Sequence, residues 1–578
     1  MITRRFQEEL HKLKDEAQNF VKAHPQLAPL MDGAQADPDI ERLFEGAGFL
    51  SAMLREKLDD DYPEIIHPLI ERIHPQWLRP TPASTIVEFT PDRALRQPFA
   101  ILAGARIASV PVEGSACHFR TCSEVMVHPL ALTDAIFRQP AGCRPSIRLT
   151  LALNDTNLSD WKVESLRFFL GGNFANAASI HLLLTRHLES IAIRPLDGGG
   201  LCSFSPDKLR TPGFDESETL MAGMPAAFPG LQVLGDYFIS PEKFLFVELD
   251  GLDSWRERGQ GANFEIAFIF KNELPLPPPV VDRSVFVLGA VPVVNLFAQN
   301  SDPIPVSGDT RVYPVQPSGK GKGQAQIWSV VGATGMLKDG MRKRSYKPCA
   351  FYGYSRGNEA SFRTIVRPRP LSSDAAVFME LNRPEQETPS SEETVTAHLI
   401  CTNGHLPERL AMGDVRVRTS DIPESIKLAN ITPVTPAADP PLEANRLWRL
   451  SSLSAMSRAA LSSAENLRGI LETCATAVRR DREGLTRNSE RIQGIVEVEA
   501  RGRDFIDRGM SWRGMDVTLR LDSGKYDGLG DLYLFGCAVE RFLGGFVTSN
   551  TLVRLIIEDT AGSFRYCWKP RPGEQPLL

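Results

Sequence analysis

Short segments rich in β-branched and aromatic residues dominate the chain from about residue 80 to residue 430. Glycine, proline or a polar turn bounds each one, as in STIVEF (84–89), SIRLTLAL (146–153), ESLRFFL (164–170), FEIAFIF (264–270) and TVTAHLICT (394–402). Branched side chains pack well on a pleated surface, whereas glycine and proline interrupt its hydrogen-bond ladder. The pattern therefore predicts a sheet-rich body, with one helical interruption at 175–187.

Helical patterns are concentrated at the two ends of the chain. Apolar side chains recur every three or four positions over 6–21 and again over 40–58, which predicts amphipathic helices. Asp37 and Pro38 have the chemistry of an N-cap and a first helical residue, and a third short helix is expected after Pro63. We therefore expect a helical N-terminal segment ahead of the sheets.

The C-terminal part mixes both kinds of element. A leucine-rich helical stretch follows residue 442, and after it come the strand VTLRLD (517–522), the helix YLFGCAVERFLGGF (533–546) and the strand TLVRLIIE (551–558). The fold class expected for the whole chain is multidomain α+β, with N-terminal helices, sheet-rich domains and a mixed α/β C-terminal part.

Two proline-rich segments are candidate domain boundaries, because such segments are extended and form no ladder of their own. They are LPLPPPVV (274–281) and ITPVTPAADPPL (431–442). With the change of pattern near Arg79, they predict four units: a helical segment at 1–78, β-rich domains at 79–275 and 276–430, and an α+β domain at 431–578.

Charge and cysteine usage exclude several classes of function. The chain has 71 acidic and 65 basic residues and a formal charge of -6, which argues against broad nucleic-acid binding. The N-terminus is charged throughout and lacks the apolar core of a signal peptide, and no run reaches the ~18 apolar residues of a membrane span. Nine cysteines without a CxxC motif are typical of a reduced, cytoplasmic protein.

One motif suggests catalysis, namely Gly353-Tyr354-Ser355-Arg356-Gly357, which fits the GxSxG pattern of serine hydrolases. A nucleophile elbow lies between a buried strand and a helix. Here the approach KRSYKPCAFY is charged, and the exit NEASFRTIVR is typical of a turn into a strand. We therefore predict no catalytic site, and a serine hydrolase centred on Ser355 is the alternative from another class.

Metal and phosphate sites are not predicted either. Residues 318–323 are rich in glycine and lysine but lack the spacing of a P-loop. Asp59, Asp60 and Asp61 are adjacent at the end of a predicted helix, so they do not share one face. Cys117 and Cys122 flank His118, but small thiols buried in a strand pair explain them better than a metal site. No cofactor is expected.

Several sequence blocks, read in order, resemble one protein family. They are F-x-x-E-L-x-x-L-x-x-E-A-x-x-F (6–20), AHP (23–25), ADPDIERL (36–43), KLDDDYPE (57–64), IHP (73–75), LRP (78–80), FPG (228–230), PEKF (241–244), PVVNLF (292–297), CTN (401–403), WRL (448–450), LFG (534–536) and WKPRPG (568–573). Together these blocks resemble the TssF (VasA/ImpG-type) baseplate subunits of the type VI secretion system. Gly404-His405 departs from the charged pair usual in the family, and residues 335–390 match poorly.

The resemblance implies a structural function. Proteins of this family form a baseplate wedge with TssG, typically two TssF copies to one TssG. With TssE and TssK, these wedges surround the VgrG hub and support assembly of the sheath and tube. The implied location is cytoplasmic, in a baseplate docked at the inner membrane complex. A wedge protein of a contractile phage-tail-like particle is the alternative within assembly proteins.

A wedge subunit needs faces that bind partners, and the amphipathic N-terminal helices are candidates. Their apolar stripes either pack within the chain or join a bundle with a partner, and the sequence leaves both open. Our hypothesis is that Leu43, Phe44 and Leu54 form part of a helical bundle with a partner.

Overall fold

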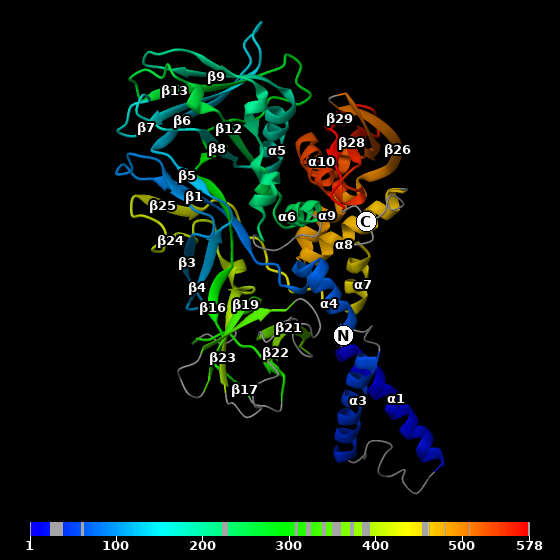
Figure 1. Ribbon diagram of the computed structural model, residues 1–578. Helices are drawn as coiled ribbons and strands as arrows, with labels where there is room; N and C mark the ends of the chain where they lie inside the picture. The colour runs from blue at the N-terminus through cyan, green and yellow to red at the C-terminus, as the bar shows by residue number, and fades with distance from the viewer. Residues whose placement is uncertain are drawn as a thin grey trace.

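The computed structural model describes residues 2–23, 38–58, 63–221, 229–306, 310–319, 325–337, 343–349, 360–369, 375–383, 393–453, 461, 463–479, 481–507 and 509–575. Sheets occupy one side of the molecule, a mixed unit containing the C-terminus lies on the other, and a pair of N-terminal helices projects from the body (Figure 1). The predicted α+β class is confirmed.

Helices lie mainly at the two ends of the described chain, with two inserted among the strands. They are α1 (Ile2–Ala23), α3 (Pro38–Leu58), α4 (Pro63–Ile73), α5 (Phe174–Leu182), α6 (Pro229–Ile239), α7 (Ala444–Ser452), α8 (Ala464–Val478), α9 (Arg482–Gln493) and α10 (Leu529–Leu543). Pro38 begins α3, as predicted, because a first helical residue needs no amide hydrogen, and the predicted N-cap Asp37 lies outside the described residues. The third predicted helix is α4, which begins at Pro63 itself. The helical interruption predicted at 175–187 is α5 with the short η3 (Leu183–His187).

A six-stranded antiparallel sheet lies at the centre of the β-rich body. Its strand order is β24 (Val417–Arg418), β3 (Arg106–Val112), β4 (Ser115–Thr121), β15 (Ala290–Val294), β1 (Ser84–Pro91) and β25 (Ile426–Asn430). β1 therefore lies between two strands that come about 200 and 340 residues later in the chain. This sheet joins strands from both predicted β-rich units, and the boundaries of those units as folding domains stay a prediction.

Two further sheets form the upper part of the body. One has the order β10 (Cys202–Phe204), β9 (Leu188–Pro195), β13 (Asn263–Phe270), β7 (Ser146–Leu153) and β6 (Leu130–Arg138). The other has the order β11 (Leu209–Arg210), β12 (Phe246–Asp250), β8 (Ser165–Leu170) and β14 (Phe286–Leu288). Their inner faces are apolar at alternate positions, so they share one core with α5, α6 and α10.

An eight-stranded sheet forms the lower lobe and has its own core around Tyr346, Met379 and Leu399. Its strands are β16 (Phe297–Asn300), β17 (Ile304–Val306), β18 (Val312–Pro314), β19 (Gln326–Leu337), β20 (Lys343–Pro348), β21 (Ser361–Pro368), β22 (Ala375–Asn382) and β23 (Glu393–Thr402). A separate pair joins β2 (Phe99–Ile101) to β5 (Val125–Val127).

The C-terminal sheet has the order β26 (Ile495–Asp507), β27 (Met510–Leu521), β28 (Leu552–Asp559) and β29 (Arg565–Cys567), with β30 (Arg571–Pro572) also on β28. α10 crosses between β27 and β28 and packs on α5 and α6. A side chain at Gly530 would lie 2.3 Å from the backbone of Ala178, so glycine lets α10 approach α5 closely.

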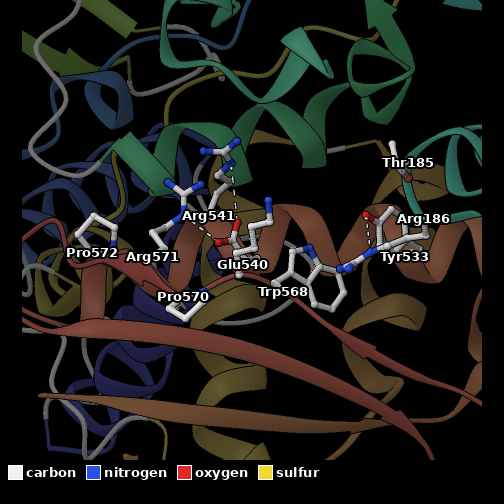
Figure 2. Close-up of a pocket in the computed structure, with 10 residues that line it drawn as sticks. Thr185, Arg186, Tyr533, Glu540, Arg541, Trp568, Pro570, Arg571 and Pro572 are labelled. Carbon is white, nitrogen blue, oxygen red and sulfur yellow. Dashed lines mark hydrogen bonds and ion pairs between the residues drawn. The ribbon is translucent and has the colours of Figure 1, made fainter. Parts of the chain in front are cut away.

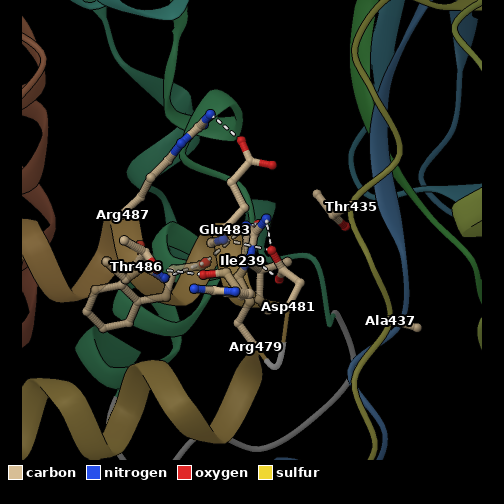
Figure 3. Close-up of polar contacts among 12 residues, drawn as sticks. Ile239, Thr435, Ala437, Arg479, Asp481, Glu483, Thr486 and Arg487 are labelled. Carbon is tan, nitrogen blue, oxygen red and sulfur yellow. Dashed lines mark hydrogen bonds and ion pairs between the residues drawn. The ribbon is translucent and has the colours of Figure 1, made fainter.

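Polar contacts attach α8 and α9 to the end of α6 (Figure 3). Arg479 donates through Nη1 to the carbonyl of Ile239 at 2.8 Å and through Nε to Asp481 at 2.6 Å. Asp481 also accepts from the amide of Gly484 at 2.7 Å, which makes it the N-cap of α9. One arginine therefore satisfies a carbonyl at the end of α6 and holds the residue that starts α9.

A buried ion pair connects α9 to α10. Arg491 contacts Asp531 at 2.9 Å, and the two side chains are 6% and 1% exposed. Tyr237 of α6 donates to the same carboxylate at 3.4 Å. Because each polar group has a partner, this network fixes three helices relative to one another inside an apolar core.

Candidate partner-binding surfaces

The N-terminal helices α1 and α3 pack side by side through one aromatic pair, one ion pair and small residues of α3. Phe6 and Phe49 meet edge to face with centroids 6.4 Å apart, and Lys14 bonds to Glu41 at 2.9 Å. Gly48 and Ala52 are buried in α3, and a side chain at Gly48 would touch the backbone of Leu10 at 3.4 Å. Small residues on α3 therefore face α1.

The opposite side of α3 is apolar, and none of the described residues covers it. Leu43 is 70% exposed and Leu50 is 61% exposed. They are seven positions apart, which places them on one side of a helix, and Ala52 lies half a turn away from that side. Amphipathic helices normally turn their apolar stripe inward, so this outward stripe is a candidate contact for another protein.

The three residues of our hypothesis lie along this helix in different environments. Leu43 belongs to the exposed stripe, whereas Phe44 is half-buried. Leu54 lies in α3 one turn after Leu50, and its side chain is outside the described part of the structure. Their role in a partner bundle stays a prediction.

The structure describes only some of the candidate chemical motifs. Residues 353–357 and 59–61 lie outside the described residues, as do 320–323. The segment after the GxSxG motif forms β21, as predicted, whereas a nucleophile elbow leads into a helix. Cys117 and Cys122 are buried, and burial raises their pKa to about 11 and about 12, so both thiols are protonated at neutral pH. Among the described residues, no group of three possible metal ligands comes together.

A cleft of about 510 Å³ lies where η3 faces α10 and the chain segment 568–572 (Figure 2). The guanidinium of Arg186 contacts two rings that stack on each other, 5.2 Å from the centroid of Tyr533 and 4.9 Å from that of Trp568. It donates to the hydroxyl of Tyr533 at 3.0 Å and to the carbonyl of Cys567 at 2.8 Å. These contacts hold the C-terminal segment against α10.

The other end of the cleft is also an internal junction. Arg571 donates to Glu540 at 2.8 Å, and Arg541 lies 3.8 Å from the same carboxylate. Burial raises the pKa of the neighbouring Cys537 thiol to about 11, so it is a poor nucleophile at neutral pH. Because these charged groups bond to one another, the cleft is a structural junction that holds the C-terminal segment against α10.

None of the helices in the described ranges is both long and apolar enough to cross a bilayer.

Comparisons with known proteins agree over the whole length of the chain. The family model "Type VI secretion system, TssF" matches residues 1–575. The "Type VI secretion system component TssF1" of Pseudomonas aeruginosa is 27% identical, over 99% of this chain and 99% of that protein.

Two solved structures are similar to the chain. A chain of the type VI secretion TssK-TssF-TssG baseplate subcomplex superposes with a TM-score of 0.77 at 26% identity, covering 92% of this chain and 99% of that one. A chain of the baseplate complex from the type VI secretion system superposes with a TM-score of 0.65 at 22% identity, covering 99% and 100%. The second likeness supports the fold.

Proposed function

The chain belongs to the TssF family of the type VI secretion system, and we propose that it is a structural wedge subunit of a type VI secretion baseplate. The observation that carries this proposal is the match of one family model to residues 1–575. The fold supports it, because a TM-score of 0.77 relates the chain to a component of a TssK-TssF-TssG subcomplex at nearly full coverage.

The proposed partners follow from that family. They are TssG, with two copies of this chain to each TssG, together with TssE, TssK and the VgrG hub. The exposed stripe of α3 supports a helical contact, because Leu43 and Leu50 present apolar surface that a partner helix could bury. The proposed location is the cytoplasm, in a baseplate docked at the inner membrane complex.

A charge placed on the α3 stripe tests the proposed contact with TssG. Leu43→Glu combined with Leu50→Glu should abolish co-purification with the cognate TssG, because a carboxylate is costly to bury in an apolar bundle. Both leucines are exposed, so the circular dichroism and melting temperature of the isolated chain should change little.

Glu45→Lys is the matched control, because Glu45 is exposed on the same helix and lies outside the stripe. This variant should still bind TssG. Full retention of TssG by the double variant would exclude the α3 stripe as the contact, and a wild-type chain that ignores TssG would contradict the proposed function itself.

We also propose that the chain has no catalytic activity. The strand after the GxSxG motif supports this, since it is not the helix that a hydrolase needs. A fluorophosphonate probe should leave the purified chain unlabelled. Labelling that disappears in Ser355→Ala would instead support the hydrolase. For the phage-particle alternative, neighbouring genes for tail fibres in place of TssG-like and TssK-like proteins would be decisive.

A further inference from the structure

The C-terminal sheet has a long uncovered edge. β26 spans 13 residues, and its register with β27 runs from Ile495 opposite Leu521 to Asp507 opposite Met510. In the described part of the chain no strand pairs with its other side. Figure 1 shows β26 on the outer side of the C-terminal unit, away from the β-rich body. A free edge of this length offers its backbone groups to another strand.

The side chains on one face of this edge have an ordered charge pattern. Glu497 and Glu499 precede Ala500, and Arg501 and Arg503 follow it. All four share a face, because strand side chains alternate between faces. They are exposed to 55%, 44%, 75% and 55%, in chain order. Two acids before a central residue and two bases after it form a pattern that is complementary to its own antiparallel copy.

We propose that β26 pairs antiparallel with β26 of a second copy of this chain, with Ala500 opposite Ala500 across a two-fold axis. In this register Glu499 lies opposite Arg501 of the second copy, and Glu497 lies opposite Arg503 of the second copy. The symmetry repeats both contacts. Opposite charges directly across an antiparallel pair are stabilising, and the backbone groups of both edges gain partners.

The charge pattern also selects the register. Moving the axis to Glu499 places two glutamates against each other, and moving it to Arg501 places two arginines against each other. A parallel pairing in register would bring every charge opposite its own kind. Like charges directly across a strand pair are destabilising, so the axis at Ala500 is favoured over these alternatives.

Contacts within the chain leave these four side chains available. Glu497 bonds to Arg520, and Glu499 bonds to Arg501, both at 2.6 Å on the exposed surface. Exposed ion pairs of this kind contribute little, and each carboxylate retains a second oxygen for another donor. Arg503 lies 3.2 Å from Asp516, which also accepts hydrogen bonds from Nε and Nη2 of Arg554 at 2.8 and 2.7 Å.

This inference deepens the proposed function and rests on it, since it identifies the surface through which two copies in one baseplate meet. The pairing joins two C-terminal sheets into one continuous sheet and makes an isologous contact, with the same strand used by both copies. The α3 stripe stays free for a different partner.

Charge reversal on the full-length chain tests the pairing. A basic edge (Glu497→Arg with Glu499→Arg) and an acidic edge (Arg501→Glu with Arg503→Glu) should each weaken self-association by about tenfold or more, because every cross-strand contact becomes repulsive. Mixed together, the two variants should associate at least as tightly as wild type. Sedimentation velocity over a concentration series measures both effects.

Glu164→Arg with Glu424→Arg is the matched control, since it makes the same charge change at exposed positions in the β-rich body. It should leave self-association unchanged. A monomeric wild-type chain, or variants that fail to associate on mixing, would overturn the pairing. Co-purification with TssG is measured in parallel and should persist in both edge variants, so failure of the pairing and failure of the proposed function are distinguishable.

A cysteine cross-link tests the register. In a chain whose exposed thiols are removed by Cys143→Ser and Cys567→Ser, Ala500→Cys should form an intermolecular disulfide on oxidation. Gly502→Cys should not, because the two Gly502 positions lie about 13 Å apart along the paired strands. Equal cross-linking at both positions would overturn the register centred on Ala500.

Discussion

The helices α3 and α10 each carry an apolar face, yet these faces lie in opposite environments. α10 is covered on most sides by α5, α6 and the C-terminal sheet, so Leu532, Leu534 and Phe535 are fully buried. α3 packs one face on α1 and leaves Leu43 and Leu50 exposed. An apolar face alone therefore does not tell a core helix from an interface helix. What separates them is how many faces find a partner in the same chain.

Truncating one apolar side chain in each helix should give very different losses of stability. Phe535→Ala should lower the free energy of unfolding by about 3–5 kcal/mol, because it leaves a cavity in a closed core. Leu50→Ala should change it by less than about 0.5 kcal/mol, because the side chain is already in water. Urea unfolding followed by fluorescence measures both, and equal losses would remove the distinction between the helices.

Acid should weaken the α10 region more than the α1–α3 pair. His181 of α5 is 1% exposed beside α10, and neither ring nitrogen has a hydrogen-bond partner in the described structure. Burial lowers its pKa to about 4 from the usual 6.5. Between these values the unfolded chain binds the proton and the folded chain does not. This contribution to stability is therefore complete above pH 6.5 and decreases as the pH falls toward 4.

The size of that loss is on the order of 3 kcal/mol over the full window. His181→Leu should flatten the dependence between pH 6.5 and 4, as measured by urea unfolding at a series of pH values. His11→Gln in α1 is the control, since that side chain is exposed and should leave the profile unchanged. A profile that keeps its slope in His181→Leu would assign the acid sensitivity to other groups.

Removing the ion pair between α1 and α3 should lower the stability only slightly. Lys14→Gln removes an ion pair with Glu41 whose side chains are 45% and 58% exposed, so stability should fall by less than about 1 kcal/mol. Amide hydrogen exchange in α1 is the sensitive measurement. A large gain in exchange there would show that polar contacts, more than the Phe6–Phe49 contact, hold the two helices together.

Local pattern was enough to predict the N-terminal helices and several of the longer strands. The three-to-four-residue spacing over 40–58 predicts α3, and the β-branched run at 146–153 predicts β7, because both depend on which face each side chain occupies. β26 is not among the predicted strands, although Val496 and Val498 alternate with Glu497 and Glu499 in a strand pattern. Its charged second half, from Arg501 to Asp504, obscured that signal.

The sequence alone does not predict which distant strands pair. Nothing near β1 indicates that Val87 will lie opposite both Val291 and Asn430, because register between distant strands depends on the rest of the sheet. The candidate interface shows the same limit. Periodicity identifies the apolar residues of α3, but only the packing of Gly48 and Ala52 on α1 shows which residues are left for a partner.

The position of β1 indicates which part of this chain can change in length without disturbing the central sheet. Between β15 and β25, which flank β1, the chain leaves the central sheet, builds the lower lobe from β16 to β23, and returns. Both ends of the lobe are therefore anchored in one sheet, and its hydrophobic core is separate from the other two cores. Because both ends of the lobe are held in the central sheet, we expect changes in its length to leave the strands that flank β1 in place.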